Sequence, residues 1–141
     1  MTDDLDTIER QIDIDASAER VWLLVSEPGW WINDGVLVEH TITHHDDHDV
    51  VVDEVHGPFR IRTELLEPPR HAAFRWLGDE DASTLVRFWI DDRPSGGVTL
   101  RVVETGFTTY PEHERKQRHE DNVEGWEQEL AIARARFVSA G

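Results

Sequence analysis

A series of strand-like segments, separated by very short breaks, constrains the fold of this chain more than any other feature. The segments cover residues 36 to 43, 50 to 55, 59 to 67, 71 to 77, 84 to 92 and 98 to 105. Glycine and proline concentrate in the breaks, as is typical of turns. Because parallel strands need long crossover connections, these short breaks predict an antiparallel meander.

The residues before the meander predict a further strand and two short helical segments. Residues 7 to 14 alternate between apolar and polar side chains, which indicates a strand that pairs at the edge of the sheet. Ser17 is a suitable N-cap for a helix that ends before Pro28. The segment that contains Trp30 and Trp31 is interpreted as a second short helix or as a structured loop carrying two aromatic residues.

Alternation along the strands predicts that one face of the sheet is apolar. The residues expected on this inner face are Phe59, Ile61, Thr63 and Leu65, then Ala72, Phe74 and Trp76, then Val86, Phe88 and Ile90, then Val98, Leu100 and Val102. An apolar sheet face has to be covered by another element.

An amphipathic helix at residues 122 to 137 is the predicted cover. Apolar residues recur there at steps of three and four, namely Val123, Trp126, Leu130, Ala133 and Phe137. Asn122 is a plausible N-cap for this helix. Gly125 inside the helix costs about 1 kcal/mol relative to alanine, which indicates close backbone approach or space left for another group.

Composition limits the class of protein. With 141 residues the chain fits one domain, residues 1 to 141, of which 1 to 6 are expected to be a flexible tail. The net charge of -16 disfavours nucleic-acid binding, and no apolar run is long enough to cross a bilayer. No cysteine is present, which is compatible with a reducing cytosol. We therefore expect a soluble, cytoplasmic protein without membrane insertion.

Four stretches carry a resemblance to a known family. They are IDIDASAERVWLLVSEPGWW at 12 to 31, GPFRIRTELLEPPRHAAFRW at 57 to 76, GGVTLRVVETGF at 96 to 107 and NVEGWEQELAIARARF at 122 to 137. The sequence resembles the family related to the activator of the heat shock protein ninety ATPase, within the START-like (SRPBCC) superfamily, which has diverse bacterial members.

The resemblance implies an α+β helix-grip fold. In such folds a curved antiparallel sheet of about seven strands wraps around a long C-terminal helix, and two short helices follow strand one. A cavity between the sheet and the helix holds lipids, polyketides or other apolar molecules. The resemblance implies no shared set of catalytic residues and no cofactor.

Large apolar and aromatic residues are the candidates for a cavity wall, because ligand pockets are mostly apolar with a few polar groups. The predicted ligand-binding residues are Trp30, Trp31, Phe59, Ile61, Trp76, Phe88, Val102, Glu104, Phe107, Trp126 and Leu130. The alternative is that these side chains are ordinary core residues, since aromatic residues at strand or helix spacing usually serve packing.

Glu104 is the one acidic residue in this set. It shares the parity of Val98, Leu100 and Val102, so it could point inward, where burial would raise its pKa and suit it as an acid, a base or a ligand anchor. Its place near the end of a strand instead favours a side chain that reaches solvent.

Two other groups of residues are considered, one as a metal site and one as a site of nucleophilic catalysis. His44, His45 and His48 are interleaved with Asp46, Asp47 and Asp49 and include metal-ligand types, but the pattern is more typical of a solvated hairpin loop, so no metal site is predicted. The serines lie at caps or turns without a nucleophile elbow, which gives no arrangement for nucleophilic catalysis.

The sequence therefore favours a binding protein for a small hydrophobic molecule, with no cofactor, over an enzyme. Two alternatives remain open. One is a co-chaperone-like protein-interaction domain, for which a surface patch around Ile132 would be the distinguishing feature. The other is a cyclase-like or hydrolase-like enzyme that acts on a hydrophobic substrate, with Glu104 as its acid or base.

Overall fold

The computed structural model describes residues 6 to 33, 37 to 78 and 82 to 137. The flexible tail predicted at residues 1 to 6 lies outside the described residues except for Asp6.

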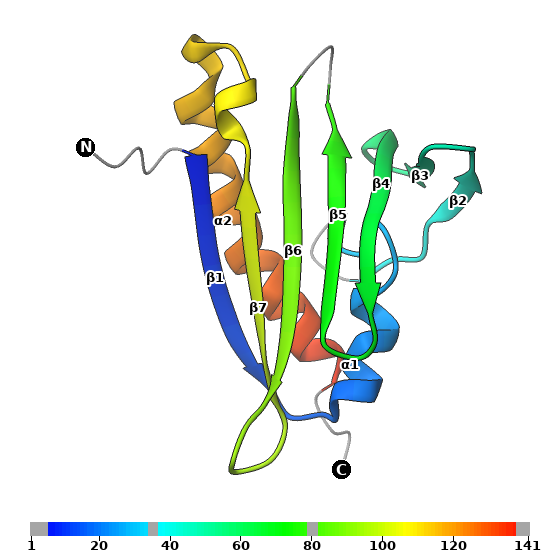
Figure 1. Ribbon diagram of the computed structural model, residues 1–141, viewed down its shortest axis with the longest axis vertical. Coiled ribbons are helices and arrows are strands. Elements are labelled where there is room, and N and C mark those ends of the chain that lie inside the picture. The colour runs from blue at the N-terminus through cyan, green and yellow to red at the C-terminus, as the bar shows by residue number, and fades with distance from the viewer. Residues whose placement is uncertain (1–5, 34–36, 79–81, 138–141) are drawn as a thin grey trace.

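The sheet has seven antiparallel strands (Figure 1). They are β1 (Thr7–Ile14), β2 (Thr41–His44), β3 (Asp49–Asp53), β4 (Gly57–Glu67), β5 (His71–Leu77), β6 (Ser83–Asp92) and β7 (Val98–Thr105). Their order in the sheet is β1-β7-β6-β5-β4-β3-β2, so neighbouring strands are consecutive in the chain except where β1 pairs with β7. This order confirms the predicted meander and the predicted edge position of the first strand.

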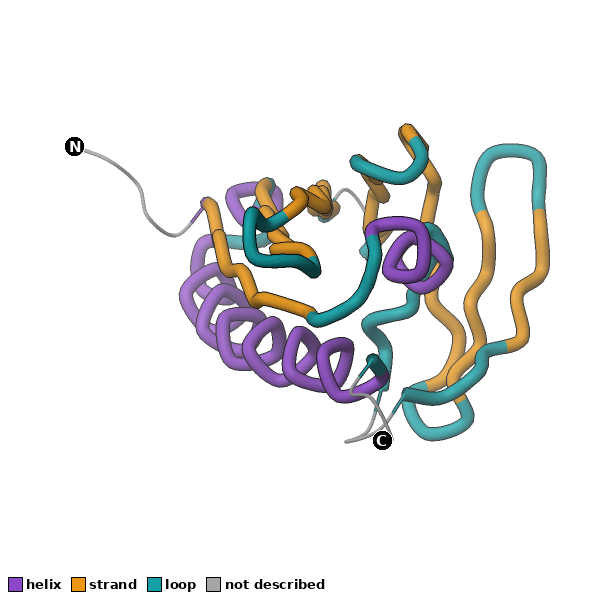
Figure 2. Tube along the Cα trace, turned by 90° about the horizontal axis from the view of Figure 1, so that it is seen from below, coloured by secondary structure: helices purple, strands orange, loops and turns teal. Residues whose placement is uncertain are grey.

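The helices are α1 (Ala18–Val25), the 3-10 turn η2 (Phe107–Thr109) and α2 (Glu112–Arg136). Ser17 caps α1 as predicted, because its side chain accepts a hydrogen bond from the backbone N–H of Arg20. In Figure 1, α2 passes behind the sheet from beside β1 toward α1, and Figure 2 shows it as a continuous coil along the strands. Within the described ranges, none of the helices is long and apolar enough to cross a membrane.

The long helix is the largest departure from the sequence prediction. Helix α2 begins at Glu112 and not at Asn122, so Asn122 lies inside the helix and the predicted N-cap is wrong. The residues from 112 to 121 are nearly all charged or amide-bearing, and most of them are good helix formers without an apolar stripe. A search for apolar periodicity therefore detects only the second half of the helix.

Two smaller predictions also need correction. Only α1 forms a helix between β1 and β2 in the described residues, and Trp30 and Trp31 lie in turns, so the structured-loop interpretation is the right one. Leu65 is not on the inner face. A register shift between Thr63 and Leu65 pairs Leu65 with Ala73, which turns it to the outer side and leaves it 40% exposed.

The core lies between the sheet and the two helices. Inner-face residues such as Ile61, Phe74, Phe88 and Leu100 are completely buried, and α2 contributes Trp126 and Leu130. Burying side chains of this size stabilises the fold by roughly 2 kcal/mol each. The polar first half of α2 contributes no buried residue, so it extends past the core.

Candidate functional site

A pair of adjacent pockets lies where the polar half of α2 leaves the core. The outer pocket has a volume of about 730 Å³ and the inner pocket about 230 Å³. Trp76, Tyr110 and Arg118 line both pockets, so the two pockets adjoin at these three side chains.

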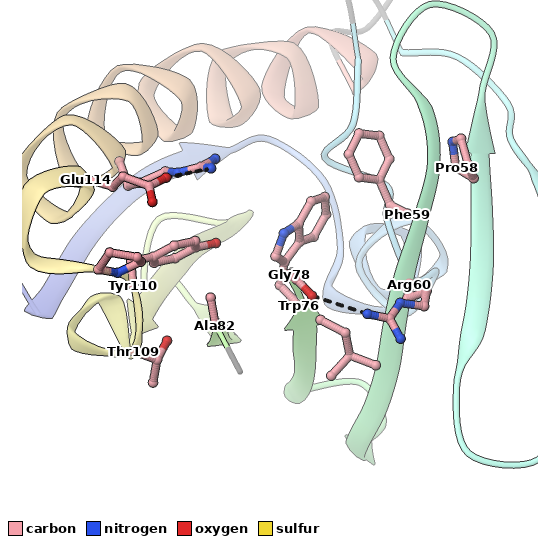
Figure 3. A pocket seen from close by; sticks show the side chains of 12 residues that line it. Pro58, Phe59, Arg60, Trp76, Gly78, Ala82, Thr109, Tyr110 and Glu114 are labelled. Carbon is pink, nitrogen blue, oxygen red and sulfur yellow. Dashed lines mark hydrogen bonds and ion pairs between the residues drawn. The ribbon is translucent and has the colours of Figure 1, made fainter. Parts of the chain in front are cut away.

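The outer pocket lies between β4, the end of β5 and the segment that leads from η2 into α2. Figure 3 shows Tyr110 and Trp76 on facing sides of this pocket, with Phe59 and Arg60 projecting from β4. Its lining residues are Pro58, Phe59, Arg60, Trp76, Leu77, Gly78, Ala82, Thr109, Tyr110, Pro111, Glu114 and Arg118.

The inner pocket lies against one face of α2. Its lining residues are Trp31, Trp76, Glu104, Tyr110, Arg118, Asn122, Gly125, Trp126 and Glu129. The α2 members are three or four residues apart, which places them on one side of the helix. An added Cβ at Gly125 would meet no atom within 4 Å, so Gly125 leaves open space there and does not serve close backbone approach.

Glu104 is the most constrained polar group at the site. It is 3% exposed, so the prediction that its side chain reaches solvent is wrong. Oε1 accepts hydrogen bonds from Nε1 of Trp126 at 2.8 Å and Nδ2 of Asn122 at 3.1 Å, and Oε2 accepts one from the hydroxyl of Thr84 at 2.5 Å. The carboxylate thus links β6 and β7 to α2.

Burial determines the protonation behaviour of the two acidic residues in the inner pocket. Loss of hydration raises the pKa of Glu104, although the hydrogen bonds from Thr84, Trp126 and Asn122 oppose the rise. Burial also raises the pKa of Glu129, and a hydrogen bond from Asn33 Nδ2 at 2.7 Å opposes it. Each carboxyl therefore holds its proton to a higher pH than an exposed glutamate does.

An aromatic cluster fills the space between the middle of the sheet and α2. The ring of Trp31 lies 5.6 Å from that of Phe74, 5.6 Å from that of Phe88 and 5.9 Å from that of Trp126, measured between centroids. The resemblance implies a cavity between the sheet and the helix. Because the aromatic cluster fills the middle of that space, the pockets lie at the end of the sheet near Tyr110.

The structure divides the predicted ligand-binding residues into two groups. Those that line a pocket are Trp31, Phe59, Trp76, Glu104 and Trp126. Those that line neither pocket and pack in the core are Trp30, Ile61, Phe88, Val102, Phe107 and Leu130.

Sequence reasoning missed several pocket residues, chiefly Tyr110, Arg118 and Glu129. Tyr110 and Arg118 fall between the last predicted strand and the predicted helix, in a stretch without apolar periodicity. Pro111 next to a run of good helix formers is a signal that could have extended the helix. Extending the helix from Trp126 by helical spacing would then have brought Arg118 and Asn122 to the pocket side.

The histidine-rich loop and Ile132 are separate from the pockets. His44 Nδ1 lies 2.6 Å from Asp49 Oδ1, His48 Nδ1 lies 2.6 Å from Asp47 Oδ1, and no group of three or more metal-ligating side chains occurs among the described residues. Ile132 is only partly exposed.

Solved structures of other proteins share this fold, although comparisons of sequence find no match. No protein-family model matches the chain, and a search of curated proteins finds no significant match. Solved structures do match. XoxI from Bacillus cereus has a TM-score of 0.73 at 13% identity, over 94% of this chain and 95% of that one. The Aha1 dimer from Colwellia psychrerythraea has a TM-score of 0.68 at 16% identity, over 96% and 98%.

The chain has the START-like, helix-grip fold. A further protein of similar structure is BexL, a di-domain ARO/CYC protein from the BE-7585A biosynthetic pathway. It matches with a TM-score of 0.65 at 10% identity, over 96% of this chain and 50% of that one. At these identities the likeness concerns the START-like fold and not the activity.

Proposed function

We propose that this protein binds a small hydrophobic molecule in the inner pocket, with part of the molecule extending into the outer pocket. The observation that carries the proposal is the open space beside Gly125, walled by the aromatic side chains of Trp31, Trp76 and Trp126. A glycine inside a helix costs stability, so an unfilled space at that position is better explained by a ligand than by packing.

The pocket dimensions support a ligand that places only part of its apolar structure in the inner pocket. The inner pocket, at about 230 Å³, is smaller than a typical drug-sized site, whereas the outer pocket, at about 730 Å³, falls in that range. A lipid, polyketide or aromatic compound could place one ring or a short chain inside and its remainder outside. The ARO/CYC protein of similar fold belongs to a biosynthetic pathway, which is compatible with small-molecule binding.

Indole NMR resonances of the six tryptophans test this proposal. We would add a panel of fatty acids, flavonoids, sterols and polyketide-like aromatics and assign each resonance by mutation. A ligand should shift the signals of Trp126, Trp31 and Trp76 saturably. Trp89 stacks on His71 and Arg101 away from the pockets, so its signal should not move. A panel that leaves Trp126 unshifted would contradict the proposal and assign that residue to core packing.

Gly125→Ala should separate stability from binding. Alanine fits without a contact inside 4 Å and favours the helix, so the free energy of unfolding should rise by about 1 kcal/mol. The added methyl group protrudes into the inner pocket, so affinity for a panel ligand should fall by about threefold to tenfold. Urea denaturation and NMR titration measure the two effects.

The control for Gly125→Ala is Gln128→Ala, an exposed position on α2 that lines neither pocket. It should leave ligand affinity unchanged. If Gly125→Ala raised stability without weakening the binding of any ligand, the space beside Gly125 would not be part of the site.

An enzyme is the second candidate function, and Glu104 is the observation that favours it. A buried carboxyl with a raised pKa at a pocket wall suits an acid or base. Once a substrate is identified, Glu104→Gln should abolish its turnover and leave its binding unchanged. Unchanged turnover would remove Glu104 from that role.

A further inference from the structure

The inner pocket combines aromatic rings with two carboxyl groups from different elements. Glu104 enters from β7, and Glu129 enters from α2 one helical turn beyond Trp126. Trp31, Trp76, Tyr110 and Trp126 supply aromatic surface to the same pocket. A purely apolar molecule would use the rings and leave both carboxyl groups without a partner from the ligand.

These two carboxyl groups lack the cationic partners that other acidic residues of the protein have. On the outer face of the sheet, Glu9 pairs with Arg101 and Glu64 with Arg62. Within the part of the chain that the structure describes, no ion pair is found for Glu104 or Glu129. Burial of a carboxylate without a counter-charge is costly, so a cation inside the pocket would offset that cost.

Arg118 lines the inner pocket and already has partners. Its Nη2 is 3.4 Å from Glu114 Oε1, and its guanidinium lies 5.0 Å from the centre of the Tyr110 ring. Among the described residues, neither His119 nor His56 forms an ion pair with Glu104 or Glu129, and His119 Nε2 lies 3.0 Å from the carbonyl oxygen of Thr7. Arg118 also shows that an aromatic wall of this site accepts a cation.

We propose that the hydrophobic ligand carries a protonated nitrogen that binds in the inner pocket between the Glu104 and Glu129 carboxyl groups and the surrounding aromatic rings. This inference rests on the proposed function and specifies its ligand class as an apolar amine. Ring faces attract ammonium groups, most strongly when water is excluded. The net charge of -16 also draws cations toward the protein and repels anions.

A ligand with an anionic head group that binds in the outer pocket has weaker support than the amine. Arg60 and Arg118 both line that pocket, but Arg60 donates to the carbonyl oxygen of Gly78 at 3.2 Å and Arg118 pairs with Glu114. The outer pocket therefore already supplies an acceptor to each guanidinium. An acid with the same apolar body as the amine distinguishes the two possibilities.

Three naphthalene compounds test the inference, namely 2-naphthylmethylamine, 2-naphthylmethanol and 2-naphthoic acid. They share one apolar body and carry a positive, neutral or negative group at neutral pH. Titration against the wild-type protein is followed at the indole resonance of Trp126, with Trp89 as the internal reference. We expect the amine to bind about tenfold more tightly than the alcohol, and the acid to bind most weakly.

Two outcomes would contradict the proposed ligand class, and they can be told apart. If the alcohol or the acid binds as tightly as the amine, the ligand class is wrong and the proposed hydrophobic site stands. If no naphthalene compound shifts Trp126, the inference is overturned, and the proposed function then depends on the wider panel.

Glu129→Gln tests whether the preference for the amine depends on the carboxylate of Glu129. The glutamine oxygen can still accept the hydrogen bond from Asn33, so the fold should be preserved while the charge is lost. The affinity for the amine should fall by about tenfold, and the affinity for the alcohol should stay unchanged. Glu120→Gln removes the same charge from an exposed position on α2 and should change neither affinity. Equal losses in both variants would indicate only the long-range field and would overturn the proposed site.

Discussion

Glu104→Ala is expected to lower the free energy of unfolding by about 4 kcal/mol, because it leaves three buried or half-buried donors without their acceptor. The hydroxyl of Thr84, the amide of Asn122 and the indole N–H of Trp126 all donate to this carboxyl group. The substitution also leaves a small space where β7 meets α2. Urea denaturation followed by far-UV circular dichroism measures the loss.

Glu104→Gln is the matched control, and its stability should depend on pH differently from that of the wild type. Glutamine keeps one acceptor oxygen and nearly the same shape, so its cost at neutral pH should be well below that of alanine. Burial raises the pKa of Glu104 above its ordinary value of 4.5, so the folded protein holds this proton more tightly than the unfolded chain does. The carboxyl group therefore contributes stability at low pH that is lost as the pH rises from 4.5 through the raised folded pKa.

Glu104→Gln lacks this titration. The stability of the variant relative to the wild type should consequently improve as the pH rises through that window. Parallel stability curves for the two proteins would show that the pKa of Glu104 is the same in the folded and unfolded chains.

Trp31→Ala is expected to be similarly destabilising, by about 4 kcal/mol, although Trp31 lies in a turn and not in a helix or strand. Its ring packs against Phe74 and Phe88 from the sheet and against Trp126 from α2. Truncation would open a cavity at the centre of this cluster. Because the substitution removes a fluorophore, circular dichroism is the suitable probe of unfolding.

Trp89→Ala is the control for Trp31→Ala. The ring centre of Trp89 lies 4.6 Å from that of His71 and 4.4 Å from Cζ of Arg101. All three side chains are partly exposed. Its loss should cost about 1 kcal/mol. Equal costs for the two variants would mean that Trp31 does not support the core.

The strands could be predicted from the sequence because their signal is local. Alternation at a period of two and short Gly-Pro breaks identify β4 to β7 within two residues at each end. The bulge before Leu65 could not be predicted, since one unpaired residue changes the register without changing the composition. β2 is shorter than predicted, because the residues from 37 to 40 are apolar in part but do not pair as a strand.

The site was harder to predict, because it depends on contacts between distant segments. Strand parity places Glu104 on the inner face, but only α2 shows whether the end of the strand is covered. Asn122 and Trp126, which donate to Glu104 from α2, both lie in the helix that the sequence predicts, but periodicity does not show which strand end this helix covers. The donors come from Thr84 on β6 and Asn122 on α2, two elements that no local pattern brings together.

Both pockets open to solvent, which determines how a bound molecule would leave. Trp76, Tyr110 and Arg118 line both spaces, while the aromatic cluster keeps the helix attached to the sheet. A molecule bound in either space could therefore leave directly to solvent, with no need to part the helix from the strands. Ligand exchange would then not require the fold to open, and its rate would be independent of the rate at which the protein unfolds.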